Sequence, residues 1–177
     1  MIGQTLVNVM KHVLAYPTES CFGLGCDPRS ARMVRRLLVI KKRPVHKGLI
    51  VLVSDMQQLR PYVDDKILAA VLASGYTAGR LTLLLPAGKR CPAWLCGKNG
   101  KVAVRWTNFV PAERLCQQSG HALVSTSANR SGQRALRTAR EVRRQFGAMV
   151  RVVAGQIGTA RTPSRIVDWQ SGRVIRD

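Results

Sequence analysis

The chain has 177 residues, 46% of them hydrophobic and 21% charged, which is the composition of a folded domain and not of a disordered segment. Lys and Arg number 29 against nine Asp and Glu, so the formal net charge is +20, which favours a polyanionic partner, nucleic acid before an anionic membrane surface. No apolar run approaches the roughly 18 residues of a membrane span and no secretory signal pattern opens the chain, so we expect one cytoplasmic domain over residues 1–177.

The predicted strands are apolar runs, most of them continuous, as expected where both faces of a sheet are covered. In chain order they are Val13–Tyr16, Leu49–Val53, Leu81–Leu85, Val102–Trp106, Ala122–Ser125, Val150–Val153 and Ile166–Trp169. Helical patterns lie between them, one capped by Asp27-Pro28, one over Lys66–Ser74 behind Asp64 or Asp65, one from Pro111 to Gly120, and one from the capping box Thr138–Glu141 to Gly147. The mixture predicts an α/β fold, a single domain with a twisted mixed β-sheet flanked by helices, with a flexible loop over Gln156–Thr162.

Five cysteines in a chain without an export signal indicate reduced thiols. Cys21/Cys26 and Cys91/Cys96 each have a C-x4-C spacing, which would allow a four-thiolate zinc site. No other ligand type flanks either pair, so we expect cysteines that pack rather than bind metal.

A glycine- and hydroxyl-rich segment, Tyr16–Gly25, is the first of three candidate binding segments. Thr18 and Ser20 can donate to an anion, and the glycines permit close approach of the backbone to a ligand. It is not a P-loop, because the Gly-Lys-Ser/Thr ending is missing, and on its own a turn with satisfied hydroxyls is the better interpretation.

The second segment is basic, and the third is rich in hydroxyls. Lys41 and Arg43 lie two residues apart where Pro44 ends a helix, so both could reach one phosphate chain, although an exposed basic helix end is equally compatible. Residues 125–129, Ser-Thr-Ser-Ala-Asn, follow a strand, where hydroxyls and an amide favour ligand contact. Arg105 interrupts an apolar run and needs a partner, which a bound carboxylate or phosphate, Glu19 or Asp168 could supply.

In this order the segments resemble the YrdC-type family, in its short, single-domain bacterial L-threonylcarbamoyladenylate synthases. The similarity runs from about Leu14 to Asp177. It rests on Tyr16-Pro17-Thr18-Glu19 with Phe22-Gly23-Leu24-Gly25, Lys41-x-Arg43-Pro44-x-x-Lys47-Gly48-Leu49, Ala103-Val104-Arg105, Ser125-Thr126-Ser127-Ala128-Asn129-x-Ser131-Gly132 and Pro163-Ser164-x-Ile166-x-Asp168.

The resemblance implies an open basic cleft and a nucleotidyltransferase that makes threonylcarbamoyl-AMP and pyrophosphate from L-threonine, bicarbonate or CO2, and ATP. It implies Mg²⁺ carried on ATP and not held by a protein cage. The product would serve threonylcarbamoyladenosine modification of tRNA, with transfer proteins of the TsaB, TsaD and TsaE type as transient partners.

By the same resemblance the binding residues divide into two groups. Threonine would be held by Thr18, Ser20, Arg105, Ser125 and Ser164. ATP would be held by Lys41, Arg43, Lys47, Lys101, Ser127, Asn129 and Arg176, with Lys41, Arg43, Ser127 and Asn129 taking the catalytic roles. His46 could also touch a ligand.

The chain departs from the family pattern at three places. Ala78-Gly79-Arg80-Leu81-Thr82 stands where Pro-Gly-Pro-x-Thr is usual, Phe109-Val110 replaces His-Pro, and the helix before Val13 looks shortened. Two rival interpretations stay open, the first because of the net charge of +20 and the second because of the change at Arg80. One is a non-catalytic protein that binds double-stranded or ribosomal RNA through Arg134, Arg137, Arg140, Arg143 and Arg144; the other is an assembly module without turnover.

Overall fold

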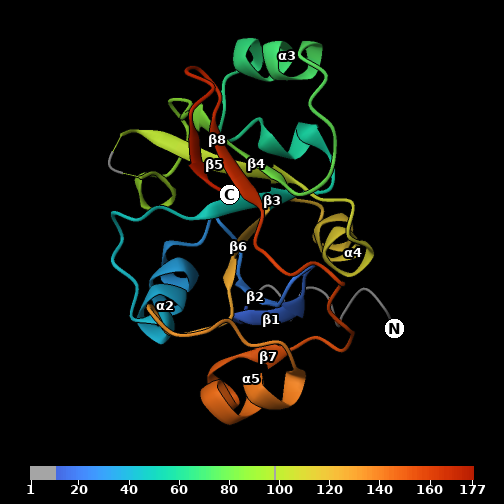
Figure 1. The fold of residues 1–177 in the computed structure, drawn as a ribbon. Coiled ribbons are helices and arrows are strands. Elements are labelled where there is room, and N and C mark those ends of the chain that lie inside the picture. Colours follow the sequence, from blue (N-terminus) through green and yellow to red (C-terminus); the bar gives the residue numbers. More distant parts are fainter. Residues whose placement is uncertain (1–10, 98) are drawn as a thin grey trace.

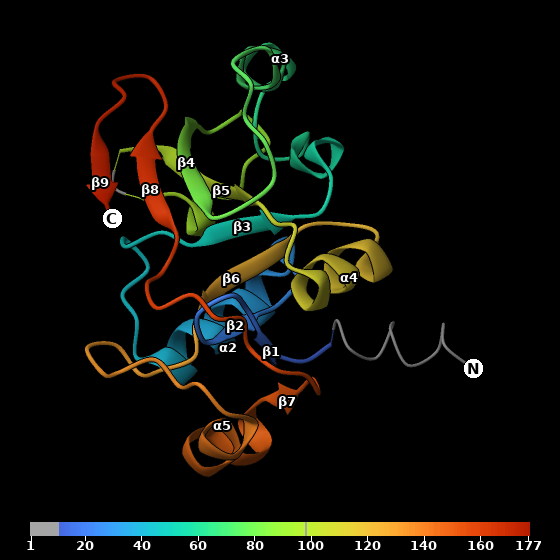
Figure 2. The same cartoon turned by 45° about the vertical axis from the view of Figure 1, so that its right-hand side comes forward.

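A twisted sheet forms the centre of the protein in a computed structural model, which describes residues 11–97 and 99–177 (Figure 1). Within these residues nine strands form it in the order β7-β1-β2-β6-β3-β5-β4-β8-β9. The strands are β1 Leu14–Pro17, β2 Phe22–Gly25, β3 Ile50–Val53, β4 Leu81–Pro86, β5 Lys101–Trp106, β6 Leu123–Ser127, β7 Arg151–Val152, β8 Arg165–Asp168 and β9 Val174–Arg176. The pairs β1–β7, β3–β5 and β4–β8 are parallel and the others antiparallel, which confirms the mixed sheet. The strand direction turns between β3 and β8 (Figure 2), as a twisted sheet requires.

All seven predicted strands form, with ends that shift by one or two residues. The sequence analysis missed β2 and β9. Glycine is a poor strand former, so β2 looked like a loop, yet it pairs with both β1 and β6. A glycine is needed at position 25 of this strand, because an added Cβ would lie 2.2 Å from the Val124 carbonyl oxygen. Strand β9 is exposed at the sheet edge and therefore carries no buried apolar pattern.

Four α-helices flank the sheet in the described residues, namely α2 Ala31–Lys41, α3 Asp65–Ala73, α4 Val110–Ser119 and α5 Ala139–Phe146. The predicted N-cap of α2 was wrong. Ser30 caps the helix by accepting from the Met33 amide, while the Asp27 carboxylate is engaged by Arg29. The capping box of α5 is confirmed, with Thr138 and Glu141 each bonding the other's backbone amide.

The core lies between the sheet and the apolar faces of the helices. Val34, Leu37, Leu24, Val51 and Val124 are fully buried there. No helix of the described residues is long and apolar enough to cross a bilayer. The expected shortening before Val13 falls mainly on residues 1–10, outside the described part of the chain.

Candidate active site

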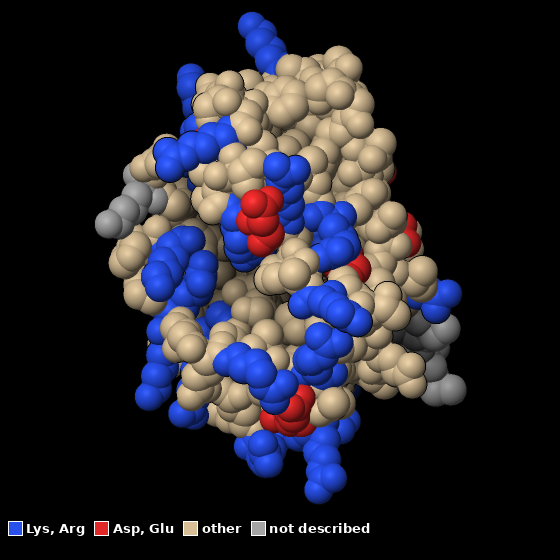
Figure 3. Space-filling view, in the orientation of Figure 1, with Lys and Arg blue, Asp and Glu red and all other residues tan. Residues whose placement is uncertain are grey.

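A cleft of about 930 Å³ opens where the β1–β2 turn, the segment after α2 and the ends of β5, β6 and β8 meet. It brings together every predicted site residue except Lys41. The lining includes Thr18, Ser20, Arg43, Lys47, Lys101, Arg105, Ser125, Ser127, Asn129, Ser164 and Arg176. Figure 3 shows Lys and Arg side chains gathered around a hollow with few acids beside it. Residues up to 158 positions apart in the chain thus form one positively charged cavity.

Lys41 takes a different place from the one expected, because its side chain turns inward at the end of α2 and is only 1% exposed. Its ammonium donates to the Asn129 carbonyl at 2.8 Å, to Asn129 Oδ1 at 3.3 Å and to the Ser127 carbonyl. Burial, with the nearby Arg43 charge as a second cause, lowers the pKa of Lys41 to about 8. Lys41 and Arg43 therefore do not extend side by side into the cleft; Lys41 supports the Ser127–Asn129 segment from behind.

Three arginines concentrate positive charge inside the cleft. Arg43 donates to the Gly48 carbonyl at 3.0 Å, and Arg176 donates to the Ser164 carbonyl at 2.7 Å. Burial lowers the pKa of both, and a neighbouring cation lowers it further, Arg176 acting on Arg43 and Arg105 on Arg176. Arg176 therefore lies close enough to both Arg43 and Arg105 for their charges to repel, so a bound anion beside Arg176 would be stabilised.

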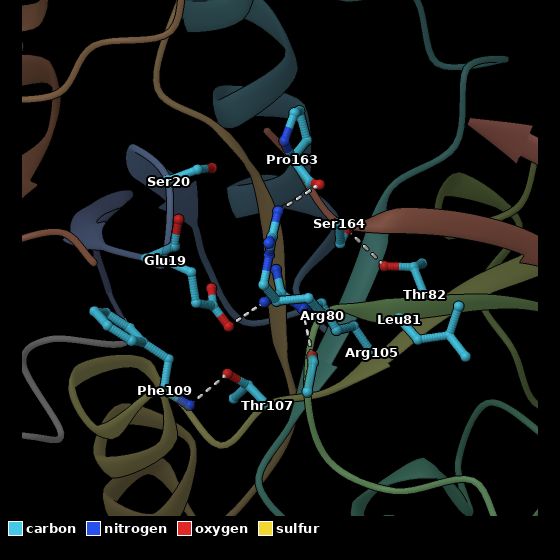
Figure 4. A network of polar contacts seen from close by, with 12 residues as sticks. Glu19, Ser20, Arg80, Leu81, Thr82, Arg105, Thr107, Phe109, Pro163 and Ser164 are labelled. Carbon is cyan, nitrogen blue, oxygen red and sulfur yellow. Dashed lines mark hydrogen bonds and ion pairs between the residues drawn. The ribbon is translucent and has the colours of Figure 1, made fainter. Parts of the chain in front are cut away.

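Arg105 finds its partner in Glu19, one of the alternatives that the sequence left open. The two form an ion pair in which Arg105 lines the cleft and Glu19 lies behind the lining, with side chains only 11% and 13% exposed, and Arg105 Nε donates to the Gly79 carbonyl at 3.1 Å (Figure 4). Asp168 pairs instead with Lys101, at 2.6 Å. An incoming carboxylate would therefore share Arg105 with Glu19 or displace it.

Hydrogen bonds fix the small polar groups of the cleft in advance. Ser127 Oγ donates to Asn129 Oδ1 at 2.6 Å, and Asn129 Nδ2 donates to the Gln133 carbonyl at 2.6 Å. Thr18 Oγ1 donates to the Cys21 carbonyl at 2.7 Å. Ser164 Oγ lies 2.9 Å from Thr82 Oγ1. Such preorganised dipoles stabilise developing charge without reorganising during a reaction.

Part of the cleft wall was not predicted from the sequence. Arg134 and Arg137, which were assigned to an RNA surface, line the cleft, as does Arg161. The segment that carries the first two returns to the cleft because the Ser131 amide bonds the Lys41 carbonyl and the Leu136 amide bonds the Ala128 carbonyl. These hydrogen bonds join segments that are distant in sequence or irregular in structure, so no local sequence pattern predicts them. His46 also lines the cleft, as anticipated.

The residues that the structure describes contain no group of three or more His, Cys, Asp or Glu side chains suited to a metal ion. The Cys91 and Cys96 sulfurs lie 3.7 Å apart, and Cys26 and Cys116 are buried. Burial raises the pKa of both Cys26 and Cys116 to about 12, which keeps these thiols protonated and poor as ligands.

A family model described as "Telomere recombination", covering the Sua5, YciO and YrdC proteins, matches residues 10–177. The chain belongs to the Sua5/YciO/YrdC family. Its relatives include proteins named threonylcarbamoyl-AMP synthase, from Chromobacterium violaceum (52% identical, 93% of this chain and 86% of the relative) and from Escherichia coli K12 (46% identical, 94% and 89%).

Solved structures of the Sua5/YciO/YrdC family share the fold. P. abyssi Sua5 complexed with L-threonine is 26% identical, with a TM-score of 0.83 over 96% of this chain, and this chain spans about half (52%) of that protein. E. coli YciO, at 24% identity and a TM-score of 0.81, covers 99% of this chain and shows the fold alone.

The departure at Phe109-Val110 leaves the local structure intact. Helix α4 still begins at Val110, because Pro111 occupies a first-turn position and the Phe109 amide donates to Thr107 Oγ1 at 3.1 Å.

Proposed function

We propose that this chain is a threonylcarbamoyl-AMP synthase, an ATP-dependent nucleotidyltransferase that uses L-threonine and bicarbonate or CO2. The observation that carries the proposal is that one cleft has two ends with different linings. Thr18, Arg105 and Ser164 line one end, the threonine end, and Arg43 and Asn129 line the other, the nucleotide end. Relatives about half identical over most of the chain bear that name. A structural neighbour at 26% identity holds L-threonine.

The proposed reaction needs positioning and charge neutralisation more than a strong protein base. The threonine amine takes up CO2 to give a carbamate and a proton. A carbamate oxygen then attacks the α-phosphorus of ATP, and the bond to the bridging oxygen breaks to release pyrophosphate. ATP and the carbamate are both anionic, which fits a cleft lined by cations and hydroxyls in which Asp168 is the only acid among the described lining residues.

We assign the threonine end to Thr18, Ser20, Arg105, Ser125 and Ser164, with Arg105 facing the substrate carboxylate. Ser125 and Ser164 are 9% and 5% exposed, so a ligand that reaches them is largely removed from water. Removal from water strengthens a charged hydrogen bond between Arg105 and a carboxylate, which helps that carboxylate compete with Glu19.

The nucleotide end comprises Arg43, Lys47, Lys101, Ser127, Asn129 and Arg176, with Lys41 supporting Ser127 and Asn129. Its chemistry fits Mg²⁺ that is carried on the ATP phosphates, because Asp168 is already paired with Lys101 and no carboxylate cage is present among the described residues. When bound, the metal would neutralise phosphate charge.

A second activity, binding of tRNA or double-stranded RNA, is favoured by the formal charge of +20 and by the arginines of α5. Arg140, Arg143 and Arg144 belong to that helix, outside the cleft lining. Transfer proteins of the TsaB, TsaD and TsaE type would take the product onward. Phosphate-driven RNA binding should weaken steeply as salt rises, and affinity that is insensitive to salt would contradict it.

Pyrophosphate release from ATP, measured with and without threonine and bicarbonate, tests the main proposal. We expect release that depends on both. Arg43→Ala should abolish it while the protein stays folded by thermal unfolding. Arg35→Ala, the same change at an exposed position of α2 outside the cleft, should leave it unchanged. Full activity of Arg43→Ala would overturn the assignment of the nucleotide end.

A further inference from the structure

Arg80 stands where the family pattern has the second proline of Pro-Gly-Pro. Its guanidinium reaches the segment that leads into the neighbouring strand, β8. Its Nη2 donates to the Thr162 carbonyl at 2.6 Å, to Thr162 Oγ1 at 2.9 Å and to the Pro163 carbonyl at 3.2 Å. Parallel pairing of β4 with β8, in register Leu81 to Arg165, places these groups side by side. The Arg80 carbonyl in turn accepts the Arg165 amide at 3.1 Å.

The segment that Arg80 holds is a strap, residues 158–163, which crosses the threonine end of the cleft. At its first end the Gly158 amide donates to the Thr18 carbonyl and the Ala160 amide to the Glu19 carbonyl, both at 3.0 Å. At its other end Arg80 binds Thr162 and Pro163, immediately before the buried Ser164. The strap overlaps the loop expected over Gln156–Thr162; it contains no helix or strand, and hydrogen bonds hold it at both ends.

The strap contributes directly to the cleft, since Arg161 and Pro163 both line it. Figure 4 shows Arg80 reaching Pro163 next to Ser164, with the pair of Glu19 and Arg105 close to Arg80. A proline at position 80 would fix the backbone but offers no donor. Arginine offers several N–H donors in a planar fork, so it can hydrogen-bond backbone carbonyls that a proline at this position cannot bind.

We propose that Arg80 is a positioning residue of the threonine end, whose guanidinium fixes the strap and thereby the place of Ser164. This proposal rests on the proposed function. It predicts a larger effect on threonine than on ATP, because the Arg80 contacts lie on the strap, whereas Arg43, Lys47, Ser127 and Asn129 of the nucleotide end lie after α2 and at the end of β6. Arg176 of the nucleotide end also bonds the Ser164 carbonyl, but it does not contact Arg80.

Steady-state pyrophosphate release tests the assignment with Arg80→Met, Arg80→Lys and a matched control, Arg165→Met. Arg165 is exposed, pairs with Asp177 and lies outside the cleft lining, so its variant loses the same charge nearby. We expect Arg80→Met to raise the KM for threonine about tenfold, the factor that corresponds to about 1.4 kcal/mol, and to leave the KM for ATP within about twofold. The KM for threonine of Arg80→Lys should lie between those of the wild type and Arg80→Met, because an ammonium has no planar fork. Equal rises in both KM values, or no rise, would overturn the proposal.

Hydrogen exchange of the strap gives a readout that needs no activity. The Gly158 and Ala160 amides should exchange faster in Arg80→Met and at the wild-type rate in Arg165→Met. Unchanged exchange in Arg80→Met would mean that Arg80 does not hold the strap. If the wild-type protein releases no pyrophosphate with threonine, the proposed function fails, and the exchange result still decides the structural role of Arg80.

Discussion

Replacing Lys41 by methionine separates a supporting role from direct contact with substrate. Two effects of the change oppose each other. Lowering the pKa of Lys41 from 10.5 to about 8 means that its charge is unfavourable in the folded protein, by about 3 kcal/mol at neutral pH. Methionine removes that cost but leaves the Ser127 and Asn129 carbonyls without the ammonium, at about 1–3 kcal/mol for each carbonyl.

We therefore expect the free energy of unfolding of Lys41→Met to lie within about 3 kcal/mol of the wild-type value at pH 7. The KM for ATP should nevertheless rise about tenfold or more, since Ser127 and Asn129 lose the group that fixes them. Urea unfolding and pyrophosphate kinetics measure the two quantities on the same preparations.

The pH dependence gives the sharper test. Between about pH 8 and 10.5 the folded protein binds fewer protons at Lys41 than the unfolded chain does, so this group makes stability rise with pH in that window. The stability of the wild type relative to Lys41→Met should grow there, by up to about 1.4 kcal/mol per pH unit. A stability difference that stays flat from pH 7.5 to 10, or an unchanged KM for ATP, would contradict a buried ammonium that supports Ser127 and Asn129.

Two further predictions concern the scaffold. Gly25→Ala should lower the melting temperature by about 5 °C or more, because its Cβ would lie 2.2 Å from a backbone oxygen of β6. Gly97→Ala is the control, because a Cβ added at Gly97 meets no atom within 4 Å. Equal melting temperatures of the two variants would contradict the close approach of Gly25 to the β6 backbone. At Glu141, hydrogen bonds from the Arg137 and Thr138 amides lower the pKa to about 2, so its contribution to stability is present above about pH 4.5 and is lost towards pH 2. Glu141→Gln should flatten that part of the curve of melting temperature against pH, and an unaltered curve would count against the capping box.

The fold was largely predictable because buried strands and capped helices leave local patterns. The run that became β3 is a continuous apolar stretch, those of β5 and β6 contain two or three consecutive apolar residues, and the Thr138 capping box is four residues long. Strand β2 was not predicted because Gly25 serves close packing against β6, a contact that only the sheet order creates.

The candidate site was predictable as a set of residue types and less so in its arrangement. Ordered motifs indicated most of the residues that line the cleft. The inward turn of Lys41, the return of Arg134 to the cleft and the Arg80 strap each depend on contacts between segments far apart in sequence. Such contacts are set by topology and leave no periodic signal.

Threonine-dependent pyrophosphate release from ATP by the purified wild-type protein, with bicarbonate present, tests the central claim most directly. We expect release that requires both threonine and bicarbonate and that disappears in Arg43→Ala but persists in Arg35→Ala. Release that ignores threonine, or no release together with no ATP binding, would contradict it.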